Sequence, residues 1–457
     1  MVKVNKNICR TIVSCISNLL LSFFVFTTLA TAQDIETKVD EYINAHMKLG
    51  NFSGSVLIAK GDEVLVRKGY GLANIEIQAS NTPETKFRLG SVTKQFTAMA
   101  IMLLQEDGLL SINDPLSKFI PDYPDGDKIT IRNLLTHTSG IPNLTDFPEL
   151  EKIKKIKTSV EEVIEIFKNE PLKFTPGEKY QYSNSGYTLL GYIIEKVSGK
   201  TYEKFLNENI FIPLNMEDSG YDHYNTVLLN RASGYSPGKD GVVNAKYIDM
   251  SIPFGGGCLY STVEDMYLWD RALYTNKLLN ESSLNEMFTP FKDDYGYGWY
   301  ISDILNRKCI RHSGGIEGFT ANISRYVNDD VCIVVLSNFE NAPINDISKG
   351  LAAILFEEEY ELPGERDIVT LDPDIYKSYV GTYEFGPDNL LNITIDNDRL
   401  FIAPPGQPEV EIFPESETTF FVKAFDAEIT FIKNEKGEVT ELIFHAGGND
   451  IPAKKIK

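Results

Sequence analysis

Runs of strand-forming residues stand at two distant places in this chain of 457 residues, and they constrain its fold more than any other feature. Residues 53–71 predict two strands joined by a turn at Lys60-Gly61-Asp62. Later strands are predicted at 295–304, 308–312, 319–327 and 331–339. Helical patterns fill the chain between the two places, for example at 91–107, 130–136, 159–168 and 184–197. Terminal strands around a helical middle predict an antiparallel sheet covered by helices.

Two further helices complete this prediction. One is expected over residues 35–48, before the first strand pair, and one from about Ile344, after the last strand. The predicted fold class is therefore α/β (α+β), with an antiparallel sheet flanked by helices and a large helical insertion. This layered unit is expected to cover residues 33–362.

The composition changes after residue 362. Residues 363–374 are rich in Pro, Gly and Asp and predict a linker. Residues 375–457 then alternate apolar and polar positions in short runs, among them LLNITI, RLFIA, FFVKAF, EITFI and VTELIFH. This pattern predicts a small all-β domain, either a sandwich or a barrel.

The first 32 residues are typical of an export signal. Three basic residues precede an apolar run, and Ala30-Thr31-Ala32 offers a small-residue cleavage site. An uncleaved anchor is the alternative, but polar residues shorten the apolar run below the roughly 20 residues that a spanning helix needs. We expect a periplasmic or secreted protein without a stable membrane span once the signal is removed.

Charge and cysteine content exclude several classes of function. Removing the signal takes away three positive charges and no negative ones, so the net charge moves from −21 to −24. Such an acidic surface makes nucleic acid an unfavourable partner. The remaining Cys258, Cys309 and Cys332 do not form a disulfide framework, and no metal-ligand spacing occurs. We therefore expect neither a metal nor another cofactor.

Ser91 and Lys94 form the first candidate pair for catalysis. They stand at the start of a predicted apolar helix, and their spacing puts hydroxyl and amine on one face. The helix N-terminus stabilises negative charge, and an inward-facing lysine loses solvation and can act as a base. The alternative is a helix-capping serine with a surface lysine, and the pair alone does not decide between them.

A second candidate group lies at Tyr182 and Asn184, in a tight loop that runs into a predicted helix. A phenol held there can relay a proton between Ser91 and a leaving group, and the amide can orient Lys94 or a substrate carbonyl. A buried tyrosine and a helix cap are the alternative. That alternative would be favoured if the segment stood alone.

His312 ends a predicted strand that runs into Ser313, Gly314 and Gly315. Glycines at a strand edge allow a substrate backbone to approach closely. The backbone N–H groups of Gly315 and Ser91 could then form an oxyanion hole. His137 and His445 are interpreted as structural, and Gly255 to Gly257 as positions of close packing.

The chain also contains motifs that compete with this interpretation. Ser236 and Lys239 repeat the Ser-x-x-Lys spacing, and Ser236 lies in a Gly-x-Ser-x-Gly sequence. In a nucleophile elbow the residue after the serine donates its N–H, but here it is Pro237, which has none. The flanking residues predict a loop, so the elbow is rejected.

The order Ser-x-x-Lys, Tyr-x-Asn, His-x-Gly resembles the serine β-lactamase and penicillin-binding-protein superfamily. The nearest branch is the class C β-lactamase-related group, with its D,D-carboxypeptidases, D-aminopeptidases and esterases. Further stretches that resemble this family are ITIRNLLTHTSGIPN, GGGCLYSTVEDMYLWDRAL and RHSGGIEGFTANISRYVNDDVCIVVLSN. The resemblance covers roughly residues 36–355, and the remainder resembles the small β domains often appended to such hydrolases.

The resemblance implies roles for individual residues. Ser91 would be the acylated nucleophile, Lys94 its base or proton shuttle, and Tyr182 a general acid and base. Asn184 would contact the substrate, with His312, Gly314 and Gly315 on the opposite side.

One departure from the family lies at His312, where many β-lactamases carry lysine. With a pKa near its ordinary value of about 6.5, this histidine would be largely neutral and the site would lack a fixed positive charge. Arg311 cannot substitute, because adjacent strand residues face opposite sides. Efficient β-lactamase activity is therefore disfavoured.

The predicted function is an exported serine hydrolase that forms a covalent acyl-enzyme. Its substrates would be D-amino-acid peptides, including peptidoglycan fragments, or small esters and amides. The alternatives are a β-lactamase proper and a non-hydrolytic penicillin- or peptidoglycan-binding protein.

Overall fold

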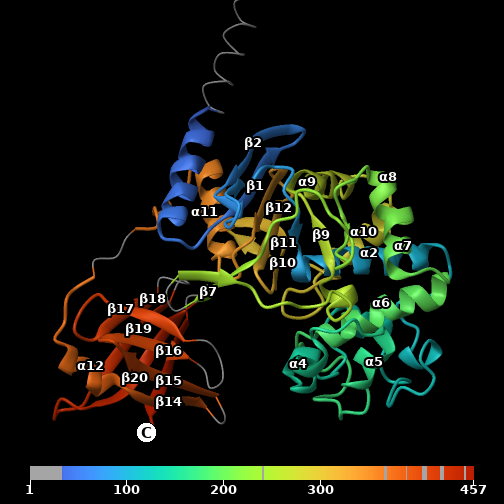
Figure 1. Cartoon of the computed structure of the whole chain (residues 1–457). Helices are drawn as coiled ribbons and strands as arrows, with labels where there is room; N and C mark the ends of the chain where they lie inside the picture. The colour runs from blue at the N-terminus through green and yellow to red at the C-terminus, as the bar shows by residue number, and fades with distance from the viewer. Residues whose placement is uncertain are drawn as a thin grey trace, which may run out of the picture.

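The computed structural model describes residues 33–238, 241–364, 368–386, 389–403, 409–422, 427–446 and 449–457. The predicted export signal at 1–32 and the competing Lys239 lie outside the described residues. Figure 1 shows a larger unit built around a sheet and a smaller β unit at the C-terminal end of the chain.

A six-stranded sheet forms the centre of the larger unit, in the order β10-β11-β12-β13-β1-β2, and all its neighbouring strands are antiparallel. The first hairpin of the chain thus pairs with strands from more than 200 residues later: Gly54 lies opposite Ser337 and Lys60 opposite Val331. Both predicted strand regions contribute to this one sheet. Its strands are β1 (Gly54–Lys60), β2 (Glu63–Tyr70), β10 (Tyr300–Ile304), β11 (Arg307–Ile316), β12 (Phe319–Tyr326) and β13 (Val331–Ser337).

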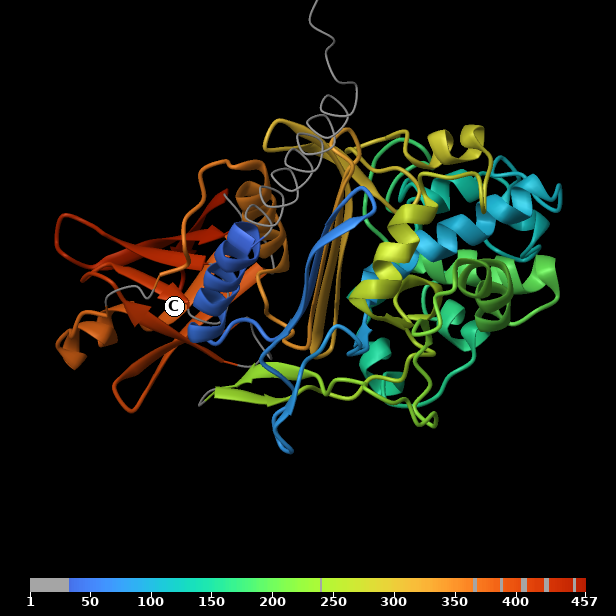
Figure 2. The same cartoon turned by 90° about the horizontal axis from the view of Figure 1, so that it is seen from above.

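The two faces of the sheet are buried against different helices. Successive strand residues point to opposite faces, so Val56 and Ile58 pack in one apolar cluster and Leu57 in another. The first cluster includes side chains of the helix at 33–48 and of α11 (Ile344–Phe356). Figure 2 shows these two helices on one side of the sheet and the helical insertion on the other. The predicted layered fold, an antiparallel sheet flanked by helices, is confirmed.

The insertion between β2 and β10 carries most of the helices and supplies one wall of the site described below. Its long helices follow from their apolar periodicity: α2 (Thr93–Glu106) is buried on nearly all sides, and α6 (Asn184–Ser198) ends at Gly199 in a left-handed conformation. The other helices are α3 (Ile131–Leu135), α4 (Glu149–Ile153), α5 (Val160–Glu165), α7 (Tyr202–Leu206), α8 (Ile212–Leu214), α9 (Val263–Ala272) and α10 (Glu281–Met287).

Short strands connect the insertion to the sheet. They are β3 (Leu72–Asn74), β4 (Ala79–Ser80), β5 (Phe87–Arg88), β6 (Gly220–Tyr221), β7 (Tyr235–Gly238), β8 (Gly241–Asn244) and β9 (Leu259–Ser261). The pair β7–β8 corrects the sequence interpretation, which expected a loop around Ser236. Tyr235 pairs with Asn244 and Ser236 with Val243, so a short antiparallel hairpin forms there despite the Pro and Gly content. The next element after β7 among the described residues is the strand β8, so the segment does not form a strand-turn-helix elbow.

The C-terminal unit is a closed barrel in which eight antiparallel strands follow in chain order and β14 pairs with β21. Its interior is a separate apolar cluster, with Tyr379 and Phe431 stacked at 4.3 Å between ring centroids. The predicted all-β region is therefore confirmed as a barrel. Its strands are β14 (Gly381–Gly386), β15 (Asn389–Asp396), β16 (Arg399–Ala403), β17 (Val410–Pro414), β18 (Thr419–Val422), β19 (Ala427–Lys433), β20 (Val439–Ala446) and β21 (Asn449–Lys455).

One detail near the barrel differs from the linker predicted at 363–374. A helix, α12 (Pro373–Tyr379), begins inside the stretch predicted as a linker, capped by the side chain of Asp372. His445 lies in β20, where it contacts Thr430 and Asp450 rather than the larger unit's site. Within the described part of the chain, every helix is too short or too polar to cross a bilayer.

Candidate active site

Ser91 lies in a short 3-10 turn, Gly90–Val92, directly before α2. Gly90 adopts a left-handed φ of 51°, and a side chain there would place its Cβ 2.8 Å from the carbonyl oxygen of Gly315. Only glycine permits both the backbone conformation and this approach. The sequence Leu89-Gly90-Ser91 therefore holds the serine against the end of β11.

The β11 side of this contact is equally close. A Cβ on Gly314 would lie 2.0 Å from the oxygen of Leu89 and 2.8 Å from the nitrogen of Ser91, whereas one on Gly315 would meet nothing within 4 Å. Gly314 thus faces the serine segment and Gly315 faces open space. The predicted strand end at residue 312 is wrong, because β11 continues through both glycines to Ile316 in register with β12.

Lys94 follows one helical turn after Ser91 and is fully buried. Its Nζ lies 2.9 Å from Ser91 Oγ, 2.8 Å from Asn184 Oδ1 and 2.9 Å from the carbonyl oxygen of Gly256. Burial lowers the pKa of Lys94 well below its ordinary value. The three contacts are with a hydroxyl, an amide and a backbone carbonyl rather than a carboxylate, so they do not offset the cost of charging the buried amine.

These three contacts orient the neutral amine. The oxygens of Asn184 and Gly256 only accept hydrogen bonds, so both N–H bonds of an uncharged Lys94 are directed to them. A charged Lys94 donates to Ser91 Oγ as well, and in the neutral amine a lone pair takes this position and can accept the serine proton. The arrangement is that of a base ready to take the proton of Ser91.

Asn184 is itself held in place by a residue that sequence reasoning missed. The side-chain oxygen of Asn143 accepts from the backbone nitrogen of Asn184 at 2.9 Å and from its Nδ2 at 3.2 Å. The second contact requires the Nδ2 group to face Asn143, which turns Oδ1 toward Lys94. Asn143 ends the stretch ITIRNLLTHTSGIPN, so the family resemblance did contain a signal for it.

Tyr182 approaches Ser91 from the other side, and its hydroxyl donates to Ser91 Oγ at 2.8 Å. Burial raises the pKa of Tyr182, although the hydrogen bond to Ser91 acts in the opposite direction, so the side chain is a phenol at neutral pH. His137 supports its ring at 4.3 Å between centroids, and the His137 Nδ1 accepts from the backbone nitrogen of Ser183 at 3.1 Å. His137 therefore positions the loop, as its structural interpretation anticipated.

His312 lies behind Tyr182 rather than at the cavity surface. Its Nδ1 is 2.5 Å from the carbonyl oxygen of Ser313, so Nδ1 carries the hydrogen, and Nε2 accepts from the hydroxyl of Tyr295 at 3.0 Å. Burial, with a smaller contribution from Lys94, lowers the pKa of His312 to about 3. The expectation of neutrality holds, but the expected pKa near 6.5 is wrong. Both ring nitrogens are occupied within the protein.

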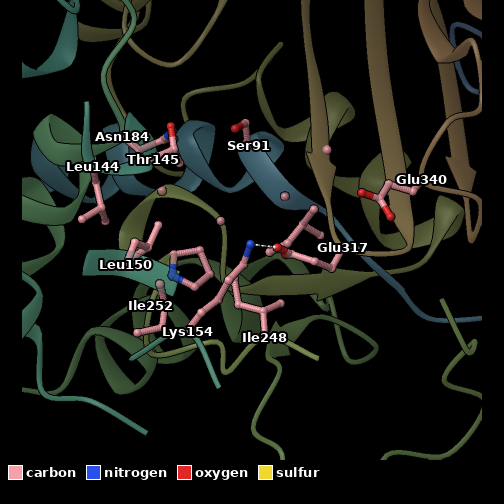
Figure 3. A pocket seen from close by; sticks show the side chains of 16 residues that line it. Ser91, Leu144, Thr145, Leu150, Lys154, Asn184, Ile248, Ile252, Glu317 and Glu340 are labelled. Carbon is pink, nitrogen blue, oxygen red and sulfur yellow. Dashed lines mark ion pairs between the residues drawn. The ribbon is translucent and has the colours of Figure 1, made fainter. Parts of the chain in front are cut away.

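A cavity of about 360 Å³ opens beside Ser91, and Figure 3 shows the side chains that line it. Ser91, Asn184 and Gly315 form one part of its surface. Much of the rest is apolar, from Leu144, Leu150, Ile248, Ile252, Pro253 and Ile316. The serine hydroxyl thus meets an open, largely apolar space of the size that binds small molecules.

Ser236 and the three cysteines are not among the residues that line this cavity. Ser236 lies in β7 and its hydroxyl donates to Glu340, so it has no lysine or tyrosine partner of the Ser91 kind among its described contacts. Cys258, Cys309 and Cys332 are free and buried. Among the residues that the structure describes, His, Cys, Asp and Glu side chains form no group of three that could hold a metal ion.

Of the seven residues proposed from sequence, the structure gathers Ser91, Lys94, Tyr182 and Asn184 into one hydrogen-bonded group and sets Gly315 beside it. Gly314 packs against the serine segment. His312 lies behind Tyr182, with 6.4 Å between the two ring centroids. Sequence reasoning missed the carbonyl of Gly256, the support from Asn143, and Tyr295. Apart from Asn143, which ends a stretch that resembles the family, these residues carry no local signal, and the spatial approach of separate segments reveals their contacts.

Comparisons with known proteins agree with this geometry. The Beta-lactamase family model matches residues 39–353, and a model described as a domain of unknown function (DUF3471) matches residues 365–454. A penicillin-binding protein of Bacillus subtilis (strain 168) is 30% identical over 429 residues, covering 87% of this chain and 94% of the relative.

Two solved structures share the fold. The octameric penicillin-binding protein homologue from Pyrococcus abyssi is 27% identical with a TM-score of 0.64, covering 92% of this chain and 99% of the other. The penicillin binding protein from Bacillus halodurans is 30% identical with a TM-score of 0.60, covering 69% of this chain and 98% of the other. The family match spans more than half of the sequence and includes every residue of the site. The chain therefore belongs to the Beta-lactamase family, within the superfamily of serine β-lactamases and penicillin-binding proteins, whose members are serine hydrolases.

Proposed function

We propose that this protein is an exported serine hydrolase that works through a covalent acyl-enzyme at Ser91. The observation that carries the proposal is the position of one oxygen: Ser91 Oγ lies 2.9 Å from the buried amine of Lys94 and 2.8 Å from the phenol of Tyr182, on the wall of an open cavity. The proposed substrates are D-amino-acid peptides of the cell-wall type, including peptidoglycan fragments, or small esters and amides.

In the proposed acylation step, Ser91 Oγ attacks the substrate carbonyl while its proton passes to Lys94 Nζ. The negative charge on the carbonyl oxygen is stabilised by the backbone N–H groups of Ser91 and Gly315, two residues that line the cavity and whose segments meet at Gly90. The leaving group takes its proton from the hydroxyl of Tyr182, and the ammonium of Lys94 restores that proton. The acid role of Tyr182 follows from its raised pKa, which keeps it protonated before the reaction.

In the proposed deacylation step, water attacks the carbonyl carbon of the Ser91 ester and gives one proton to the neutral Lys94. The bond between this carbon and Ser91 Oγ then breaks, Lys94 returns the proton to Ser91 Oγ, and the carboxylic acid is released. His312 takes no proton in either step, because both of its ring nitrogens are engaged and its pKa is low. Gly314 and His312 serve instead to fix the backbone and the aromatic surroundings of the site.

Turnover of three substrate types tests this proposal: a D-alanyl-D-alanine peptide, para-nitrophenyl acetate and nitrocefin. Ser91→Ala should abolish the turnover that the native protein shows, while Ser236→Ala, in the competing motif, should leave it unchanged. Turnover retained in Ser91→Ala would refute the role of Ser91. A stable adduct without turnover would identify a non-hydrolytic binding protein instead, and nitrocefin turnover alone a β-lactamase.

We also propose the division of the chain into an export signal (1–32), a hydrolase unit (33–362), a linker (363–374) and a C-terminal unit (375–457). The relatedness to penicillin-binding proteins is compatible with a periplasmic or secreted location. N-terminal sequencing of protein recovered outside the cytoplasm should begin at Gln33. Recovery of the intact N-terminus in the cytoplasmic fraction would contradict export.

A further inference from the structure

An ion pair joins the two walls of the cavity beside Ser91. Lys154, which caps the C-terminal end of α4, places its Nζ 2.5 Å from Oε1 of Glu317, in the turn between β11 and β12. Both side chains are largely shielded from solvent, with 20% and 15% exposure. Figure 3 shows this pair lying across the cavity from Ser91. The helical insertion and the sheet are thus tied together at the substrate site itself.

Other contacts keep Lys154 in this position. A second carboxylate, that of Glu151, lies 3.1 Å from its Nζ. The carbonyl oxygen of Lys154 accepts from the backbone nitrogen of Asp249, in the segment that also lines the cavity through Ile248 and Ile252. The ammonium therefore has two anionic partners and a fixed backbone. A substrate group would have to displace Glu317 to reach it.

Beyond the Lys154–Glu317 pair, one more acidic residue, Glu340, lines the cavity. The described lining residues include one basic side chain, Lys154, and two acidic ones, Glu317 and Glu340, and Glu340 accepts from the hydroxyl of Ser236. The lining thus holds one cation, already paired, and two carboxylates. An anionic substrate group gains no free positive charge here and meets carboxylate repulsion.

We propose that the Lys154–Glu317 ion pair is a specificity determinant that makes this cavity accept an uncharged, apolar acyl group and reject one bearing a carboxylate. This inference rests on the proposed acyl-enzyme function and adds the substrate class. The apolar lining supplies the favourable contacts, and the ion pair closes the polar end of the space. The preferred acyl donor is therefore an ester or amide of a neutral, hydrophobic acid.

Three para-nitrophenyl esters of matched length test the inference: hexanoate, the adipate monoester, and trimethylammonio-pentanoate. They share one leaving group and differ only in whether the acyl chain ends in a methyl, a carboxylate or a cation. The full-length native protein should hydrolyse hexanoate with the highest kcat/KM and the adipate monoester with the lowest.

Two substitutions should change this selectivity in opposite directions. Glu317→Gln removes the negative partner, so kcat/KM for adipate relative to hexanoate should rise at least about tenfold, which corresponds to about 1.4 kcal/mol. Lys154→Met leaves the carboxylate of Glu317 unpaired, so the ratio for the cationic ester should rise instead. A general loss of structure would not favour the anionic ester in one variant and the cationic ester in the other.

Lys168→Met is the matched control. Lys168 also pairs with a carboxylate three residues earlier, Glu165, and with a distant one, Asp122 at 2.5 Å, but it is not among the residues lining the cavity. Its substitution should leave all three ratios unchanged. Hydrolysis of the esters with unaltered ratios in both cavity variants would overturn this inference alone. Failure to hydrolyse any of them would overturn the proposed function and this inference together.

Discussion

Replacing Asn184 by Asp should move the pH dependence of acylation toward alkaline pH. Asn184 Oδ1 lies 2.8 Å from Lys94 Nζ and accepts one of its hydrogens. The substitution keeps the shape and the acceptor but adds a negative charge, which favours the ammonium form of Lys94. Because acylation requires the neutral amine, the acidic limb of the pH profile must shift upward.

The size of the shift follows from the distance. Coulomb's law with an effective dielectric constant of about 20 gives roughly 6 kcal/mol at this separation, or about 4 pH units at most. Desolvation of the new carboxylate reduces this figure, so we expect a displacement of about 1–4 pH units. The fold should tolerate the change, since position 184 begins α6, where an acidic residue is favourable.

The assay is the second-order rate constant for inactivation by a fluorophosphonate, measured from acid to alkaline pH. Asn184→Leu is the matched control, because it removes the acceptor without adding charge and should lower the rate without moving the limb to higher pH. A profile of Asn184→Asp that superimposes on the native one would refute the reasoning, because Lys94 would then not be the titrating base.

Three other predictions concern the surroundings of the serine. Tyr182→Phe removes the donor of a 2.8 Å hydrogen bond but keeps the ring, so steady-state turnover should fall by about 10²–10⁴-fold with little change in Tm, and unchanged turnover would contradict the acid role. Gly314→Ala should cost about 1–3 kcal/mol in denaturant unfolding, because its Cβ would lie 2.0 Å from the oxygen of Leu89, whereas Gly315→Ala should be neutral in stability and should slow turnover of bulky substrates; equal effects on stability would contradict the packing described. The folded-state pKa of His312, about 3, lies below its ordinary value of 6.5, so stability is lost as pH falls from about 6.5 toward 3, at up to about 1.4 kcal/mol per pH unit. His312→Gln should flatten this acid dependence in denaturant titrations, and an unchanged slope would contradict the buried, neutral state.

The fold was predictable where local patterns were strong. Helices α2 and α6 have long apolar periodicity, and both were expected within about two residues of their observed ends. The closure of the barrel was harder to predict from sequence, because β14 and β21 are far apart in the chain and no local pattern indicates that they pair. Strand β17 lacked a signal that distinguished it from connecting chain. Helix α12 did carry a start signal, Asp372 followed by Pro373, but the Pro, Gly and Asp content of this stretch was interpreted as a linker.

In the candidate site, too, the residues with a local motif were predictable and those that depend on tertiary contacts were not. Ser91 and Lys94 are separated by one helical turn, so their meeting follows from local geometry, and Tyr182 was found through its motif. The state of His312 depends on burial and on Tyr295, whose position no local pattern specifies. The pair of Lys154 and Glu317 was likewise invisible, because it joins segments about 160 residues apart without any motif.

The most direct measurement is the location of the acyl group itself. A slowly hydrolysed ester is mixed with the native protein, the reaction is quenched in acid, and tryptic peptides are examined by tandem mass spectrometry. The account predicts a mass increase equal to the acyl group on the side chain of Ser91, absent from Ser91→Ala. An acyl group on Ser236 or another residue, or turnover with no covalent intermediate under any quenching time, would contradict it.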